Sequence, residues 1–289
     1  MLSLLLLTGC PTPCVGVGCA EEYPAALAGV LTGLTDLTRP PTSPRQTTLT
    51  IEGSDALGPD WSIALSDGVL LLGSADGNAV YRFTAADSGT IDLADGTEAL
   101  LYGEASGDGF GHALTVLGDD LLIGAPTRAS SSFSYRDGVV YRIADGVGGP
   151  AASLNADAAS LRVVGTEQGG LFGSVLVSCA DIDGDGTPDW AASAPYDSSG
   201  ATLGGFVSLA LSSALPASDG SPQTMSSRSV GAWWTGSSVG EQAGKSLNCA
   251  HDLTARGAGR VESGAEDVPD LLIGAPFADV GEAADAYGA

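Results

Sequence analysis

The sequence predicts an all-β fold built from repeated hairpins. Glycine supplies 42 of the 289 residues, charged residues make up only 16%, and Asp-Gly pairs recur along the chain. This combination is typical of short strands joined by tight turns. A hydrophobic content of 44% is enough to bury a core in a chain of this length. The sequence therefore favours a packed β-rich domain over a disordered or long-helical chain.

The first segment, residues 1–9, is an apolar run that ends in small residues before Cys10. Leu7 to Cys10 resemble a bacterial lipobox, in which Cys10 is the lipidated residue. No Lys or Arg precedes the run, so a plain signal peptide or a chance apolar start is the alternative. A helix needs about 20 apolar residues to span a membrane, which this run does not supply. We expect an exported protein of the bacterial envelope or surface, held to the membrane only by its lipid anchor.

Residues 10–47 carry scattered prolines without a sustained period, which predicts a tether between the anchor and the folded part. Residues 48–289 then repeat in four units, about 48–97, 98–159, 160–230 and 231–289. Each unit has a short apolar strand ending in Gly, a Gly-rich approach and a hairpin, and the first three add another strand. Four strands per unit predict the blades of a β-propeller. A sandwich of stacked hairpins is the alternative.

Signature residues recur at the two strands of each hairpin. They are Phe110-Gly111 with Gly124-Ala125-Pro126, Phe172-Gly173 with Ser193-Ala194-Pro195, and Ala243-Gly244 with Gly274-Ala275-Pro276. These pairs resemble FG-GAP repeats, a family that includes the head of integrin α chains and many bacterial surface proteins. The resemblance implies a seven-bladed propeller, of which about four blades are present here. The first unit departs from the pattern, with Trp61-Ser62 and Gly73-Ser74-Ala75 in place of the signature residues.

The hairpin loop of the third unit predicts a metal site. Carboxylates stand at loop positions 1, 3, 5 and 9, and glycines between them allow a tight turn. Oxygen ligands in this number suit Ca2+ better than Mg2+. The FG-GAP resemblance adds the backbone carbonyl of position 7, so the expected ligands are Asp181, Asp183, Asp185, Thr187 and Asp189. An EF-hand is excluded because position 12 is Ala192, within a predicted strand; a merely solvated acidic turn is the alternative.

The fourth unit has a longer loop between Cys249 and Asp270, in which an insertion separates the acidic residues, so the sequence leaves open whether this loop holds a second metal site. Cys179 and Cys249 occupy equivalent places at the ends of strands in successive units. The sequence leaves open whether they form a disulfide or remain two buried thiols. Cys14 and Cys19 are a local candidate pair in the tether.

The charge balance and the scarcity of catalytic side chains limit the function. With 35 Asp and Glu against 11 Lys and Arg, the net charge of -24 repels a nucleic-acid backbone. Gly236 to Gly240 match the G-x-S-x-G pattern, but a nucleophile elbow needs a helix after it and a repeat hairpin is expected there. We therefore expect a non-enzymatic binding or adhesion module for a protein or glycan. The alternative is an accessory or catalytic part of a secreted hydrolase or lyase whose active residues lie outside this chain.

Overall fold

The computed structural model describes residues 2–6, 47–52, 60–84, 87, 89–93, 99–130, 135–148, 154–216, 222–249 and 270–278. Within these ranges the fold is all-β, as predicted, with two short 3-10 turns, Ala156–Ala158 and Ser212–Ala214. No helix in the described part of the chain is long and apolar enough to cross a membrane. The tether cysteines, Cys10 and the fourth-unit loop between 250 and 269 lie outside the described residues.

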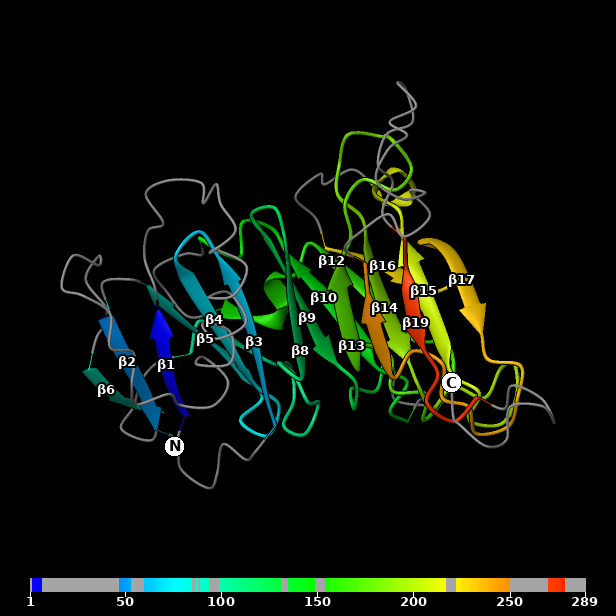
Figure 1. The fold of residues 1–289 in the computed structure, drawn as a ribbon, viewed down its shortest axis with the longest axis horizontal. Helices are drawn as coiled ribbons and strands as arrows, with labels where there is room; N and C mark the ends of the chain where they lie inside the picture. The colour runs from blue at the N-terminus through cyan, green and yellow to red at the C-terminus, as the bar shows by residue number, and fades with distance from the viewer. Residues whose placement is uncertain are drawn as a thin grey trace, which may run out of the picture.

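Three large sheets lie side by side along the molecule (Figure 1). The first has the order β11-β7-β5-β4-β3, formed by Leu154–Asn155, Leu101–Tyr102, Ala79–Thr84, Val69–Ser74 and Trp61–Ser66. The second has the order β16-β12-β10-β9-β8, formed by Gln223–Ser226, Leu161–Val164, Val139–Ile143, Asp120–Ala125 and Ala113–Leu117. The third has the order β13-β14-β15-β17, formed by Val175–Ser178, Trp190–Ala194, Phe206–Ala210 and Gly231–Thr235.

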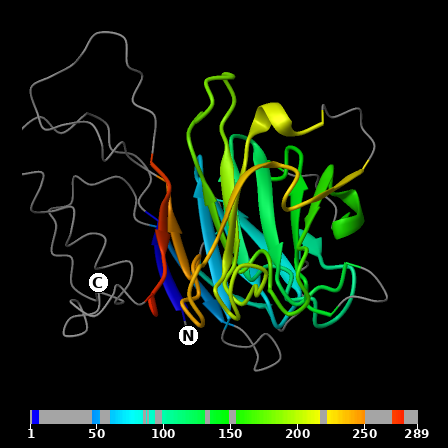
Figure 2. The same ribbon diagram turned by 90° about the vertical axis from the view of Figure 1, so that its right-hand side faces the viewer.

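Two smaller sheets flank these three. At one end, β1, β2 and β6 pair in that order over Leu2–Leu6, Thr47–Glu52 and Gly89–Asp92. At the other end, β18 and β19 form a hairpin from Ser246–Asn248 and Leu272–Gly274. Figure 2 shows this last hairpin and the third sheet from the side.

Each large sheet takes its strands from two successive sequence units. Its three antiparallel hairpin strands come from one unit, and the next strand comes from the start of the following unit: β7 pairs with β5, β12 with β10, and β17 with β15. A further short strand then joins in parallel, β11 beside β7 and β16 beside β12. β6 pairs with β2 in the same parallel manner. Neighbouring units are therefore interlocked through backbone hydrogen bonds.

The central strands carry apolar side chains on both faces because both faces are covered. Leu122 and Ile123 are adjacent on β9, so their side chains point to opposite faces of the second sheet. Ile123 packs with Leu71 of the first sheet in one buried cluster, whereas Leu122 packs with Trp190 of the third sheet in another. A strand buried on both faces is rich in apolar residues, and β4, β9 and β14 have such runs, interrupted only by Ser193 in β14 and bounded by Ser74 in β4 and Asp120 in β9.

The signature glycines lie where adjacent sheets come closest. A Cβ atom on Gly124 of β9 would lie 2.1 Å from the carbonyl oxygen of Gly173, in the turn before β13. The preceding interface repeats the arrangement, with a Cβ on Gly73 placed 2.2 Å from the Gly111 carbonyl oxygen. Gly111 and Gly173 also have positive φ, which only glycine adopts without strain. Close sheet packing therefore explains why these glycines recur at a fixed place in each unit.

The first unit fits the repeat differently from the sequence prediction. Ser62 lies opposite Gly73 in β3–β4, just as Ala113 lies opposite Gly124 in β8–β9. Asp60, rather than Ser62, therefore occupies the place of Gly111. The prediction that Trp61-Ser62 replaces the Phe-Gly pair is wrong by two residues, because the strand register and not residue similarity fixes the equivalence.

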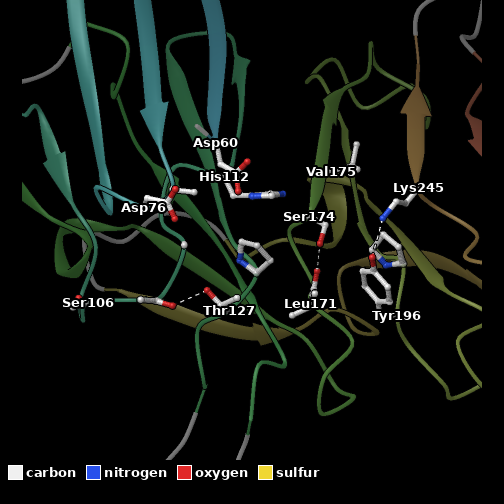
Figure 3. A pocket seen from close by; sticks show the side chains of 15 residues that line it. Asp60, Asp76, Ser106, His112, Thr127, Leu171, Ser174, Val175, Tyr196 and Lys245 are labelled. Atoms are coloured by element: carbon white, nitrogen blue, oxygen red, sulfur yellow. Dashed lines mark hydrogen bonds between the residues drawn. The ribbon is translucent and has the colours of Figure 1, made fainter. Parts of the chain in front are cut away.

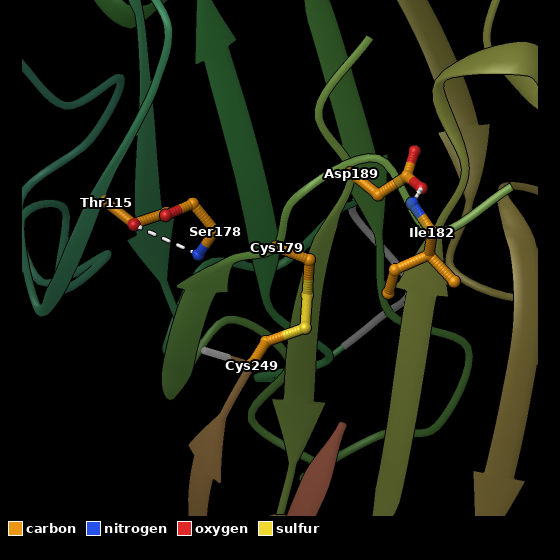
Figure 4. The surroundings of a disulfide bond; sticks show 6 residues. All are labelled: Thr115, Ser178, Cys179, Ile182, Asp189 and Cys249. Carbon is orange, nitrogen blue, oxygen red and sulfur yellow. Dashed lines mark hydrogen bonds between the residues drawn. A yellow bond between two sulfur atoms is a disulfide. The ribbon is translucent and has the colours of Figure 1, made fainter. Parts of the chain in front are cut away.

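Cys179 and Cys249 form a disulfide, which decides between the two alternatives that the sequence left open (Figure 4). Their Cα atoms are 5.1 Å apart, and both residues are buried. Cys179 follows β13 and Cys249 follows β18, so the bond links the third sheet to the last hairpin. A small apolar cluster that includes Ala191 and Leu209 surrounds it.

Candidate functional site

The predicted metal loop connects β13 to β14 at the tip of the third hairpin. Asp181, Asp183 and Asp189 each direct a carboxylate oxygen into one place, where the oxygens lie within 4.8 Å of one another. Asp181 is partly exposed, Asp183 is exposed and Asp189 is fully buried. Gly184 and Gly186 have φ of +78° and +88°, so the loop curls through backbone conformations that L side chains rarely adopt.

Asp181 is the centre of this loop. Its carboxylate accepts backbone N–H hydrogen bonds from Gly184 at 2.7 Å, Asp185 at 3.1 Å and Gly186 at 2.6 Å. These donors, with Gly186 contributing most, lower the pKa of Asp181 because they favour its charged form. The loop backbone therefore holds one carboxylate ionised and oriented before any cation is considered.

The other two carboxylates are oriented both by the loop backbone and by the 3-10 turn after β15. Asp189 accepts a backbone N–H hydrogen bond from Ile182 at 2.9 Å (Figure 4) and a second from Ser212 at 2.8 Å. Asp183 accepts hydrogen bonds from the Ser213 hydroxyl and the Asp185 N–H. Ser212 and Ser213 belong to the short 3-10 turn after β15, so the third sheet itself supports the loop.

Asp185 is the one predicted carboxylate that lies outside this cluster. Asp185 turns its carboxylate toward Thr187, accepting the backbone N–H of that residue at 2.7 Å and its hydroxyl hydrogen. The structure thus brings together three of the predicted residues, Asp181, Asp183 and Asp189. Their donor set consists of carboxylate oxygens, the ligands preferred by Ca2+, which takes six to eight oxygens in flexible geometry. Backbone carbonyls and water would have to supply the remaining ligands.

A pocket of about 650 Å3 lies at the opposite end of the same hairpins (Figure 3). We call it the open-end pocket and define it by six of its lining residues: Asp60, Asp76, His112, Thr127, Tyr196 and Lys245. Val175, where β13 begins, also lines it, whereas Ser178 at the other end of β13 leads to the metal loop. Pocket and metal loop are therefore separate features at the two ends of one strand.

The charges in the open-end pocket act on His112. Although this residue is exposed overall, desolvation by the surrounding pocket lowers the pKa of its imidazole. The carboxylate of Asp60 raises this pKa, and the ammonium group of Lys245 lowers it further. Lys245 in turn donates a hydrogen bond of 3.0 Å to the hydroxyl of Tyr196 and lies over its ring.

Sequence reasoning did not identify this pocket, although the repeats contain a signal for it. His112, Ser174 and Lys245 each directly follow the second signature residue of their unit, and all three line the pocket. Thr127 and Tyr196 each directly follow a signature proline. These pocket residues differ from unit to unit, whereas the signature residues beside them recur. They meet at one end of the hairpins because the units stack in register.

The G-x-S-x-G segment has a structural role in the described residues. Ser237 and Ser238 donate their backbone N–H groups to Glu241 at 2.9 and 3.0 Å, which closes a turn after β17. The chain then enters β18 and not a helix, so the strand–turn–helix geometry of a nucleophile elbow is not formed there.

No protein-family model matches the chain, and no curated protein matches its sequence.

Proposed function

We propose that this chain is an exported, calcium-binding β-propeller of the FG-GAP type that acts as an interaction module at the bacterial cell surface. The observation that carries the proposal is the convergence of Asp181, Asp183 and Asp189 on a hairpin tip whose backbone N–H groups already orient one of them. Such a module would present its loops to a protein or glycan ligand. Lipidation of Cys10, which lies outside the described residues, would hold it at the membrane.

The order of the sheets supports the propeller part of the proposal. The first hairpin strands of successive sheets contact one another in chain order, β3 with β8, β8 with β13 and β13 with β18. Radially arranged blades have this pattern, because their innermost strands meet around an axis. The exchange of strands between units also supports a propeller. Each sheet includes a strand from the next unit, so every blade would need its neighbour to be complete.

Electrostatics supports the calcium part. Three carboxylates forced within 4.8 Å repel one another unless a cation or protons neutralise them. Asp181 resists protonation because of its backbone donors, so a cation is the better way to relieve the repulsion at neutral pH. Extracellular modules bind Ca2+ with dissociation constants of about 0.1–1 mM. A tenfold to hundredfold excess of Ca2+ would then stabilise the fold by about 1.4–2.7 kcal/mol.

Calorimetric titration of the full chain with Ca2+ tests the proposal. We expect one site of millimolar or better affinity and a calcium-dependent rise in melting temperature. Asp183→Asn should remove most of the calcium affinity and most of the rise in melting temperature, because one of the three clustered carboxylates is lost. The variant should still fold, since Asp183 is exposed and does not belong to the core.

Asp119→Asn is the matched control, since Asp119 is an exposed aspartate on the short hairpin turn of the second sheet. It should leave the affinity and the calcium-dependent rise unchanged. Absence of heat at 10 mM Ca2+ from the folded wild-type chain would overturn the calcium assignment, and so would equal effects of the two substitutions.

A further inference from the structure

The open-end pocket carries opposite charges at its two ends. Asp60 and Asp76 lie on one side, and Lys245 lies on the other (Figure 3). Lys245 is the single lysine of a chain whose net charge is -24. Its ammonium group is held against Tyr196 by a hydrogen bond and by the face of the ring. A ligand that spans the pocket thus meets negative potential at one end and a fixed cation at the other.

The carboxylates at the acidic end of the pocket are available to bind a ligand. Among the described residues, the carboxylates of Asp60 and Asp76 have no hydrogen-bond or ion-pair partner within the protein, and both residues are exposed. Two such carboxylates on one side of a pocket favour a positively charged group. A metal ion is a poor fit to this end, because the two carboxylates belong to no group of metal-ligating side chains among the described residues.

The middle of the pocket offers little hydrogen bonding. Pro126, Pro195, Leu171 and Val175 supply apolar surface, and the prolines have no N–H to offer. Four hydroxyl-bearing residues line the pocket. Thr127 donates to the Gly107 carbonyl oxygen at 2.7 Å, Ser174 donates to the Leu171 carbonyl oxygen at 2.6 Å, and the hydroxyl of Tyr196 accepts from Lys245, which leaves Ser106. His112 points into the space between the charged ends. A sugar ring, which presents hydroxyls all round, would have to place some of them against the apolar surface.

From this arrangement we infer that the open-end pocket binds a short peptide in an extended conformation, with a cationic group at Asp60 and Asp76 and a carboxylate at Lys245. The volume of about 650 Å3 lies within the range of 300–1,000 Å3 that is typical of ligand pockets. The apolar middle suits small aliphatic side chains between the two charges. The assignment rests on the proposed interaction function and specifies the site and the ligand class for it.

The test uses the full chain and tetra-alanine as the probe, in four forms: free, N-acetylated, C-amidated and blocked at both ends. Reductive methylation with 13C labels Lys245 and keeps its charge, so one side-chain NMR signal reports on the basic end. Free tetra-alanine should shift this signal and the His112 ring signals. Blocking either end should weaken binding about tenfold, because a hydrogen bond between charged groups is lost.

A substitution at the basic end of the pocket should affect only the preference for a free peptide carboxylate. A substitution at the acidic end should affect only the preference for a free peptide amino group. Lys245→Ala should make the free and C-amidated peptides bind equally, while the N-acetylated peptide still binds less well. Asp76→Asn should reduce the discrimination against the N-acetylated peptide and leave the preference for a free carboxylate intact. Asp119→Asn, on the opposite end of a hairpin, should alter neither, and circular dichroism should show that all three variants remain folded.

Equal binding of all four peptides, or no shift of Lys245 and His112 at 10 mM free peptide, would overturn the assignment. A shift produced by a neutral trisaccharide in place of the peptides would also overturn it, in favour of a glycan. Calcium titration of the same sample separates the two levels of failure. If Ca2+ binds and no peptide does, only the pocket assignment fails; if neither binds, the proposed function fails with it.

Discussion

At the residue scale, His112 offers a direct measurement of the charges in the open-end pocket. Desolvation and the nearby Lys245 lower its pKa, and Asp60 partly offsets them. NMR titration should therefore give a pKa below the ordinary value of about 6.5. Replacing Lys245 with Ala should raise it, and replacing Asp60 with Asn should lower it. The ring is then mainly neutral at pH 7, and protonation as the pH falls should weaken the fold slightly, since the unfolded chain binds the proton more readily.

Opposite shifts in the two variants are the decisive feature of this prediction. A general change in folding would move the pKa of His112 in the same direction in both. An unchanged pKa in Lys245→Ala would show that the lysine does not face the imidazole in solution.

The residues of the metal loop could be predicted from the sequence because their spacing is local. Asp181, Asp183 and Asp189 lie within one hairpin turn, so the curl of the loop is enough to bring them together. Asp185 was also expected there, but its carboxylate forms a local turn with Thr187. The pocket residues come from four different units, and only the stacking of sheets places them side by side. No local pattern contains that information.

At the element scale, the close approach of neighbouring sheets predicts the effect of adding one methyl group. Gly124→Ala would place a Cβ 2.1 Å from the Gly173 carbonyl oxygen, which is backbone and cannot turn aside. We expect a loss of about 1–3 kcal/mol in the free energy of unfolding, as is usual for overpacking. Chemical denaturation measures this loss.

Gly148→Ala is the matched control for this substitution. Gly148 is exposed, and a Cβ there would meet only the Asp145 carbonyl oxygen, at 4.0 Å. Its free energy of unfolding should change little or rise slightly, because alanine restricts the unfolded chain. Equal losses in both variants would mean that the sheets do not approach as closely as described.

The hairpin strands were predictable and the accessory strands were not. β4, β9 and β14 have apolar runs ended by Ala or Pro, and turns such as Asp67-Gly68 mark where the chain reverses. β11 has two residues and β16 has the polar sequence QTMS, so neither has a recognisable period. Both exist because an outer strand still offers unpaired backbone groups to a passing segment.

At the scale of the whole molecule, the disulfide should be a major source of stability. It closes a loop with a sequence separation of 70, for which the loss of chain entropy corresponds to about 4 kcal/mol. Dithiothreitol should lower the melting temperature of the wild-type chain. It should leave the double variant Cys179→Ala, Cys249→Ala unaffected, because that variant has already lost the bond. Alkylation of both thiols in the unreduced wild-type protein would contradict the bond itself.

The sequence predicted an all-β chain of repeats, and the described residues confirm that much. How the sheets pack against one another depends on contacts between units far apart in the chain, which repeat spacing does not specify. Because Cys179 and Cys249 occupy equivalent places in successive units, the sequence predicts that they lie near each other. Choosing between a bond and two thiols required the 5.1 Å separation of their Cα atoms.

The position of the disulfide also sets how the molecule would respond to mechanical load. If the proposed anchor holds the N-terminus and a partner binds nearer the C-terminus, the molecule is pulled along its chain. The bond between Cys179 and Cys249 excludes the residues between them from stretching, a length of about 240 Å when extended. The metal loop lies inside this protected stretch. Its carboxylates would bear no tension while the sheets before Cys179 unravel, so the loop could keep a bound calcium ion through that extension.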